Sequence, residues 1–315
     1  MPTNINGQGN SFNLPNYSGE LFTIDAEVTP FLSMAGGLTG GKQTTSNEFA
    51  IDSTYSYPTA AQPAISEQAS TTAPTAVTYV RDQSKNVTQI FQESVNITYR
   101  ALSNGGKLSG LNIAGQSNNV VSEKDFQIAR ALTKIARDAE HTFLNGSYNL
   151  ATTAATVDKT RGMFELTSTG NTVVGAGAQL TKAMIDKLLR DMYTNGARFD
   201  NMVLFTNAFQ KQVITSLYGY APQDRNVGGL DIQQIETDFG KIGIVLDRFV
   251  GADKVGLFDM AHVSPVLQLV PEKGHLFYEE LAKTGAAESG QIFGQMGLDH
   301  GNKALHGSIT GLATS

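Results

Sequence analysis

The feature that most constrains this chain is a long amphipathic stretch from Ser122 to Leu144, SEKDFQIARALTKIARDAEHTFL. Its apolar residues recur at spacings of three and four, which places them on one face of an α-helix. That face comprises Phe126, Ala129, Leu132, Ile135, Ala136, Ala139 and Phe143, with Leu132 and Ile135 expected in the core. The charged residues, Lys134 and Glu140 among them, are expected on the solvated side. At 1.5 Å per residue the helix is about 35 Å long, so we interpret it as a spine crossing a whole domain.

Composition limits the classes of protein that fit this spine. The chain has 315 residues, enough for one large or two ordinary domains, and its net charge of −6 argues against a basic groove for nucleic acid. The absence of cysteine excludes disulfides, thiolate metal sites and cysteine nucleophiles, and fits a reducing cytoplasm. The polar segment 1–16 predicts no secretory signal. No run of about 18 apolar residues occurs, so we expect no membrane partner.

Two strands with an unusual connection precede the spine. Residues 42–57 and 87–99 alternate between apolar and polar side chains and are predicted to form a hairpin. The segment between them, 58–85, is rich in Ala, Thr, Ser and Pro and has few large apolar groups. A compact domain rarely carries so long a connection, so we predict an arm that projects and contacts another chain. Residues 1–19 are expected to be a second, extended arm.

The segment after the spine alternates helices with strands. The sequence predicts a helix over 180–193, a buried strand over 202–206, and a second helix capped by Asn207. A hairpin is expected from 232–239 and 242–249 around Gly240, followed by further short strands up to Ile309. The predicted fold class is α+β, with a central α/β segment of about 80 residues between two β-rich segments.

One motif resembles a nucleotide-binding loop. Gly36–Lys42 (GGLTGGK) matches the first seven positions of a phosphate-binding P-loop, but Gln43 replaces the Ser or Thr that binds magnesium. A P-loop follows a buried strand and opens a helix, whereas an alternating strand is expected after Lys42. We interpret the segment as a flexible hinge at the base of the arm. Lys42→Ala is then expected to change stability by no more than roughly 0.5 kcal/mol.

No other pattern nominates a chemical site. The five histidines are scattered: His141, His262, His275, His300 and His306. Asp299, His300 and His306 lie close in sequence but lack the spacing of known zinc motifs, so we expect them to satisfy local hydrogen bonds. Glu279 and Glu280 point to different faces of a strand and are interpreted as solvated charge. We therefore predict no catalytic, cofactor-binding or metal site, and a protein that is not an enzyme.

Five stretches, taken in order, resemble the major capsid proteins of tailed bacteriophages, the Hong Kong ninety-seven type of fold. They are NEFAIDST, NVTQIFQESVNIT, ARALTKIARDAEHTFLNG, LTKAMIDKLLRDMYTNGA followed by VLFTNAFQKQVI, and the tail from Leu281 to Ser315. The resemblance covers nearly the whole chain and rests on the order of the elements. It implies an N-terminal arm (1–40), a long hairpin called the E-loop (41–101), a P-domain with the spine helix (102–172), an A-domain (173–255) and a return to the P-domain (256–315).

The resemblance also implies a function. The chain would be a structural subunit of an icosahedral phage head, assembling into hexamers and pentamers that enclose double-stranded DNA through non-specific contacts. Scaffold, portal and decoration proteins would be further partners, and the absence of a long N-terminal scaffolding domain implies a separate scaffold or none. The protein would be found in the virion capsid, after assembly in the host bacterial cytoplasm. Two alternatives remain: an encapsulin, which is a bacterial compartment shell of the same fold, and a nucleotide-binding enzyme using Gly36–Lys42.

Overall fold

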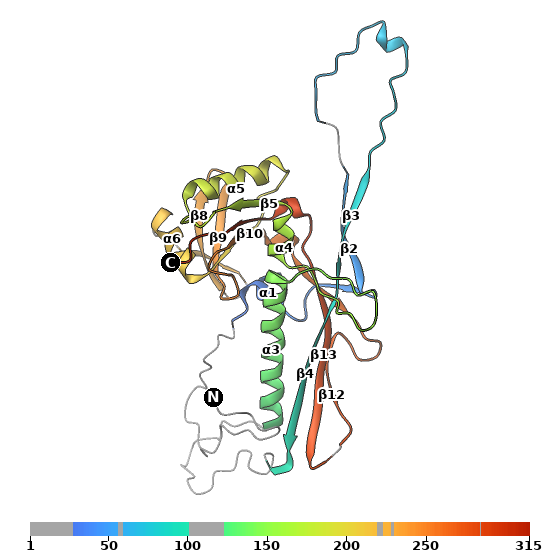
Figure 1. Cartoon of the computed structure of the whole chain (residues 1–315), viewed down its shortest axis with the longest axis vertical. Helices are drawn as coiled ribbons and strands as arrows, with labels where there is room; N and C mark the ends of the chain where they lie inside the picture. The colour runs from blue at the N-terminus through green and yellow to red at the C-terminus, as the bar shows by residue number, and fades with distance from the viewer. Residues whose placement is uncertain (1–27, 56–58, 101–122, 219–222, 228–229, 284) are drawn as a thin grey trace.

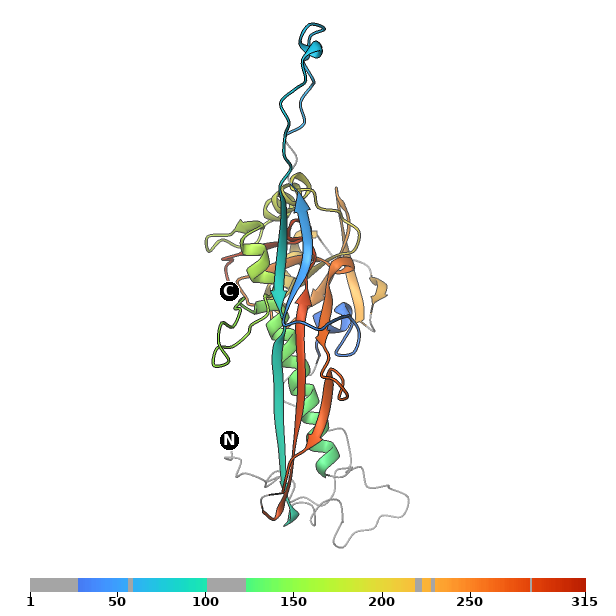
Figure 2. The same ribbon diagram turned by 90° about the vertical axis from the view of Figure 1, so that its right-hand side faces the viewer.

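The structure is a computed structural model, and it describes residues 28–55, 59–100, 123–218, 223–227, 230–283 and 285–315. The expected arm over 1–19 lies outside the described residues, as does Ser122, where the amphipathic stretch begins. The molecule is elongated: a hairpin arm extends from one end, a long helix beside a narrow sheet runs to the other, and a second sheet lies to one side (Figures 1 and 2). No described helix combines the length and apolar character needed to cross a bilayer.

The predicted spine is confirmed as helix α3, Glu123–Asn145. Ile135, Ala139 and Phe143 are buried on its apolar face as expected, but Leu132 is only partly buried and Ala129 is exposed. The prediction for Glu140 was wrong, because this residue is fully buried. It lies at the edge of the apolar face where helix α1, Pro30–Ala35, docks across α3. A charge pattern on one helix cannot show where a second helix will cover it.

The difference in burial between Leu132 and Ile135 gives the first prediction. Ile135→Ala should lower the free energy of unfolding by about 3 kcal/mol, because it leaves a cavity in a fully packed site. Leu132→Ala should cost less than half of that, since its side chain is already partly in water. Chemical denaturation of both variants checks this. Equal losses would mean that the apolar face of α3 is rotated from the one described.

The spine helix packs along a five-stranded sheet. Its central strand is β13, Ala287–Asp299, which pairs on one side with β4, Gln89–Thr98, from Met296↔Gln89 to Ala287↔Thr98. The other side of β13 pairs with β12, Leu276–Glu280, and with β11, Ser264–Gln268. Strand β1, Lys42–Thr44, adds to β11 in parallel. Phe91 of β4 and Ile292 of β13 join Ile135 of α3 in one core, so helix and sheet form a single layered rod (Figure 2).

The arm differs from the expected hairpin in its second strand. Its strands are β2, Glu48–Tyr55, and β3, Arg81–Val87, paired antiparallel from Glu48↔Val87 to Tyr55↔Arg81. The predicted pairing of 42–57 with 87–99 was wrong, since β4 pairs with β13 instead. The alternation in 87–99 is real, because Phe91, Val95 and Ile97 are buried. Alternation shows that a strand has a buried face, but not which strand it pairs with.

The second sheet has seven strands in the order β5-β14-β10-β6-β9-β8-β7. The expected helices are confirmed as α5, Lys182–Thr194, and α6, Ala208–Tyr218, with Asn207 Oδ1 accepting the Gln210 N–H (2.9 Å). The expected hairpin is also confirmed, with its turn two residues earlier than predicted. The strands are β5 (Asn171–Val174), β6 (Met202–Thr206), β7 (Gln223–Val227), β8 (Leu230–Thr237), β9 (Gly240–Leu246), β10 (Val255–Asp259) and β14 (Gly307–Thr310).

The last sixty residues contribute to both sheets. Strands β11 to β13 lie in the five-stranded sheet, whereas β10 and β14 lie inside the seven-stranded sheet. The boundary expected at 255/256 therefore falls within β10. The division of the chain into domains stays a prediction, and the sheets show only that the tail is shared.

A cluster of aromatic rings joins the two halves of the molecule. Phe31 of α1 packs edge-on against Phe205 of β6 and Phe258 of β10, with ring centroids 5.3 and 6.2 Å apart. Phe164 of the short helix α4, Met163–Ser168, packs against Phe258 from another side (5.7 Å). Helix α1 begins at Pro30, a position where proline costs no hydrogen bond.

Candidate functional site

The most distinctive surface of the molecule is the tip of the arm, residues 59–80. Every residue in it is exposed, and its only regular element is the single turn η1, Ala69–Thr71. It projects beyond the rest of the molecule (Figure 1). Four large apolar side chains are half exposed or more: Ile65, Val77, Tyr79 and Val80. Apolar groups held this far from the protein's own core are typical of a surface that contacts another chain.

The base of the arm, in contrast, is fixed by a buried asparagine. Asn86 of β3 is fully buried, and its Nδ2 donates to the carbonyl oxygens of Leu298 (2.8 Å) and Arg161 (3.3 Å). Its Oδ1 accepts the Arg161 N–H (2.8 Å). One side chain therefore joins the arm to β13 and to the loop that follows α3. No sequence pattern indicates this role, because the partners of Asn86 are 75 and 212 residues away.

A second set of contacts holds the other side of the base. The Thr88 N–H donates to the Asn47 carbonyl (2.8 Å), and Gln268 of β11 bonds both Thr88 Oγ1 (2.5 Å) and Asn47 Oδ1 (2.9 Å). Phe49 lies over Gly297, where a Cβ would come 2.8 Å from its ring. The arm thus has a rigid base and an uncovered tip. Such an arrangement can present a fixed contact surface to a neighbour but has no feature of a reaction centre.

The glycine-rich loop is a packed turn. It closes α1, with the N–H groups of Gly36 (3.1 Å) and Gly37 (2.7 Å) donating to the Leu32 carbonyl. Gly41 has φ of 125° and lies so close to Pro265 that a Cβ would be 2.2 Å from its carbonyl oxygen. Strand β1 follows, as the sequence predicted, where a P-loop would open a helix. The Lys42 side chain is largely exposed, but its charge is paired with the nearly buried Asp299.

This ion pair changes the expectation for Lys42→Ala. The variant should lose about 1 kcal/mol of stability, more than the sequence predicted, because among the described residues the Asp299 carboxylate then keeps only the Gly301 N–H as a partner (3.0 Å). The matched control is Lys85→Ala, whose partner Glu48 is partly exposed, and it should change stability by no more than roughly 0.5 kcal/mol. Denaturation curves with and without ATP provide the measurement. Stabilisation of the parent by ATP that Lys42→Ala abolishes would restore the nucleotide-binding hypothesis.

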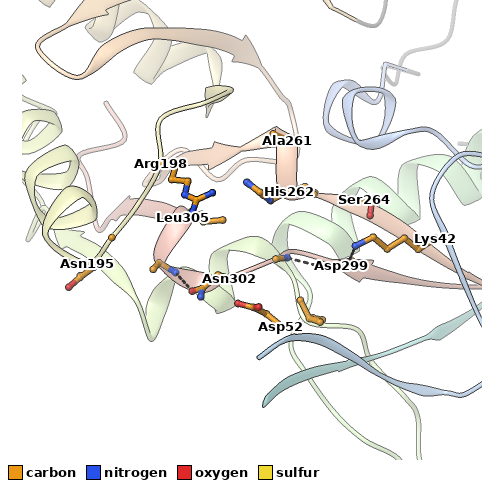
Figure 3. Close-up of a pocket in the computed structure, with 15 residues that line it drawn as sticks. Lys42, Asp52, Asn195, Arg198, Ala261, His262, Ser264, Asp299, Asn302 and Leu305 are labelled. Atoms are coloured by element: carbon orange, nitrogen blue, oxygen red, sulfur yellow. Dashed lines mark hydrogen bonds and ion pairs between the residues drawn. The ribbon is translucent and has the colours of Figure 1, made fainter. Parts of the chain in front are cut away.

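A polar pocket of about 700 Å³ lies between the base of the arm and the second sheet. Its lining includes Lys42, Asp52, Arg198, His262 and Asp299, which come from four separate parts of the chain (Figure 3). Ile51 and Asp52 reach it from a β-bulge in β2. Among the described residues, His262 makes no hydrogen bond to Ser264 or to an aspartate, so the pocket holds none of the pairs that activate a nucleophile.

The other histidines have structural environments. His300 and His306 are fully buried, and burial lowers their pKa values to about 4 and about 3, so both are neutral. His306 Nδ1 accepts the Asp259 N–H (3.2 Å), which makes Nε2 the donor to the His300 carbonyl (2.6 Å). The bond between His306 and His300 is local, as expected, but Asp259 lies 47 residues from His306, and His300 Nε2 is buried without a partner in the described structure. His141 is exposed beside Phe249, and His275 is half-buried near β12. Glu279 and Glu280 pair with different lysines, Lys273 and Lys124.

The structure also brings together two carboxyl groups that the sequence did not connect. The Glu140 oxygens accept the N–H groups of Phe31 (2.8 Å) and Leu32 (2.6 Å), which lie in the first turn of α1. Asp247, at the end of β9, is its other neighbour and is also buried. Burial and the proximity of Asp247 raise the pKa of Glu140 to about 9. Glu140 therefore holds a proton at neutral pH, and this proton can satisfy Asp247 Oδ2, which otherwise has no partner.

The arrangement of elements defines a class of protein. The fold matches the shell proteins of the Hong Kong ninety-seven type, as three solved structures illustrate. The capsid of cyanophage A-1(L) superposes with a TM-score of 0.63 at 13% identity, covering 95% of this chain and 96% of the other. The native GTA particle capsid gives 0.57 at 12% identity, covering 97% of each chain. The SrpI encapsulin of Synechococcus elongatus gives 0.57 at 10% identity, covering 95% and 94%.

The family follows from the sequence itself. Residues 4–313 match the SU10 major capsid protein family, so the chain belongs to that family of phage capsid proteins. No curated protein matched the sequence. The resemblance to tailed-phage capsid proteins and the expected α+β fold are confirmed, and the phage capsid function has better support than the encapsulin alternative.

Proposed function

We propose that this chain builds an icosahedral phage head, in which hexamers and pentamers close around double-stranded DNA. The observation that carries the proposal is the arm: a hairpin with a buried, hydrogen-bonded base and a tip exposed along its whole length. In a ring of identical subunits each arm can lie on a neighbour and bury Ile65, Val77 and Val80 there. A closed ring repeats the contact between one subunit's arm and its neighbour at each subunit boundary. One arm per subunit therefore supplies a contact at every boundary in the ring.

The net negative charge of the chain fits a protein that encloses DNA better than one that binds a specific DNA sequence. With 29 acidic and 23 basic residues the subunit has no excess of cations to neutralise phosphates, so contacts with packaged DNA would be few and non-specific. Scaffold, portal and decoration proteins are the further partners that a phage head implies. We place assembly in the host bacterial cytoplasm and the mature protein in the virion. We infer no enzymatic activity, since Gly36–Lys42 is packed against Pro265.

Electron microscopy of the full chain, expressed in a bacterium and purified, tests the proposal. We expect closed shells with five-fold and six-fold capsomers. Particles isolated from infected cells should protect double-stranded DNA from nuclease. Shells that enclose a defined protein cargo and no DNA would favour the encapsulin alternative, which the similarity to the SrpI encapsulin keeps open. A chain that forms no particle under either condition would contradict both.

A further inference from the structure

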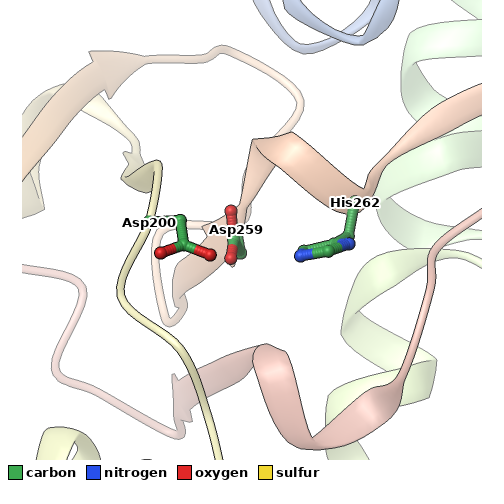
Figure 4. A group of neighbouring side chains, drawn as sticks. All are labelled: Asp200, Asp259 and His262. Carbon is green, nitrogen blue, oxygen red and sulfur yellow. The ribbon is translucent and has the colours of Figure 1, made fainter.

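We propose that Asp200, Asp259 and His262 bind a divalent transition-metal cation such as Zn²⁺. Each residue offers one ligand atom, and these atoms all lie within 4.8 Å of one another. Figure 4 shows the carboxyl group of Asp259 between that of Asp200 and the ring of His262. The cluster is separate from Asp299, His300 and His306, whose sequence spacing does not match known zinc motifs.

The pairing of two strands creates the cluster. Strands β6 and β10 are antiparallel, with Met202 opposite Asp259. Residues just before β6 therefore lie beside residues just after β10, which places Asp200 next to the turn η2, Met260–His262. The Met260 N–H donates to the Asn201 carbonyl (3.1 Å), fixing the two backbones together. The sequence could not show this, because nearly sixty residues separate the two segments.

Asp259 supplies the observation that points to a ligand. Its side chain is fully buried, and Oδ1 accepts the Ala261 N–H (3.1 Å). Oδ2 is buried without a hydrogen-bond partner of ordinary geometry in the structure, although the Asn201 N–H also lies near the carboxyl group. A buried carboxylate oxygen without a partner is costly and rare in native proteins, so it calls for a proton or a cation. Asp200 and His262 are the groups positioned beside it to complete a cation's coordination.

His262 is placed and available as a ligand. Its ring is exposed, and it forms no hydrogen bond to any described residue. Its backbone packs closely against Gly301, where a Cβ would lie 3.0 Å from the His262 Cβ. The charged neighbour to consider is Arg198, which lines the same pocket but forms no ion pair with Asp200 or Asp259 in the described part of the chain. Two carboxylates balance a divalent charge, so Arg198 does not prevent binding.

The set of donor atoms favours a particular class of metal. One imidazole nitrogen with two carboxylate oxygens suits Zn²⁺ and similar ions, whereas Mg²⁺ and Ca²⁺ prefer oxygen ligands alone. Zinc–ligand distances of about 2.0–2.2 Å require donor atoms roughly 3.4 Å apart, so the three donor atoms, now within 4.8 Å of one another, must come closer on binding. Three protein ligands would leave a fourth position for water or a group from another molecule. The cation would cross-link the α5–β6 loop to η2, the turn that connects β10 of one sheet to β11 of the other.

Calorimetric titration of the purified full chain with Zn²⁺, and separately with Mg²⁺, is the test. We expect one Zn²⁺ per subunit and a thermal midpoint that rises with Zn²⁺ concentration. His262→Gln and Asp259→Asn should each weaken Zn²⁺ binding at least about tenfold, since losing even a supporting contact has that effect. Without metal, Asp259→Asn should melt no lower than the parent, because an amide leaves no unpaired buried charge. A protein that merely needs the carboxylate for structure would melt lower.

Two controls separate this site from general electrostatics. Asp52→Asn removes a carboxylate charge from the wall of the pocket that His262 also lines. His275→Gln removes a histidine elsewhere in the molecule. Both variants should bind Zn²⁺ like the parent. Absence of saturable Zn²⁺ binding, or equal binding by the parent and His262→Gln, would overturn the site. Equal responses to Mg²⁺ and Zn²⁺ would overturn the assignment to a transition metal. Should Asp259→Asn fail to fold, His262→Gln decides the question, because its side chain is exposed.

Discussion

Replacing residues 59–80 by a short turn containing glycine is expected to abolish closed shells while leaving the unfolding of the unassembled subunit nearly unchanged. Every replaced residue is exposed, so the subunit loses no buried surface. Strands β2 and β3 keep their register up to Tyr55↔Arg81, and Asn86 still anchors the base. A shorter loop also costs slightly less entropy, on the order of 1 kcal/mol. Assembly fails because each ring contact loses the apolar groups of the tip.

Two measurements on this variant are needed: a thermal melt of unassembled protein, and electron microscopy of the assembly reaction. Ile65→Ser, Val77→Ser and Val80→Ser combined should reproduce the assembly defect at full arm length. The matched control changes three polar tip residues, Gln62→Ser, Gln68→Ser and Thr72→Ser, and should assemble normally. Normal shells from the shortened chain would show that the arm is not an assembly element. A large loss of stability would show that the tip belongs to the subunit's own core.

Glu140→Ala should lower the free energy of unfolding by about 4 kcal/mol, since it leaves buried groups without partners. The N–H groups of Phe31 and Leu32 lose their acceptor, and Asp247 loses the group that shares its proton. Helix α1 has no other side-chain cap in the structure. The loss should therefore exceed that of Ile135→Ala. Urea denaturation at neutral pH measures it. A loss below that of Leu132→Ala would mean that α1 is not held by Glu140.

The same pair predicts how stability depends on pH. Glu140 has a pKa of about 9 in the folded chain, against an ordinary value of 4.5, so the folded state keeps a proton that the unfolded state releases. The contribution of this group is complete below about pH 4.5 and is lost as the pH rises towards 9. Asp247→Asn should flatten this dependence, because its amide can donate to Glu140 without a proton from solution. Asp253→Asn, the matched control, should keep the slope of the parent.

The sequence alone determined the elements whose pattern is local. The 3.6-residue period defined α3 to within one residue at each end, because a helix that packs on one side must repeat apolar groups with that period. The sequence likewise predicted the helix over 180–193, the buried strand over 202–206 and the cap at Asn207. Helix caps and apolar faces involve residues that are neighbours in sequence, so their patterns are local. The long polar insert predicted an arm, and the structure shows its tip fully exposed.

Only the tertiary structure decided which strands pair and which polar groups are buried. The alternation in 87–99 is compatible with pairing to any strand. In the structure the strand that pairs with it is β13, some 200 residues away. The sequence pattern places Glu140 on the surface, but in the structure it is buried against α1 and Asp247, which follows β9. Asp200 lies beside Asp259 and His262 because β6 and β10 are antiparallel. The physical reason is the same in each case. Local periodicity records that a face is buried, whereas its partner is set by contacts between distant parts of the chain.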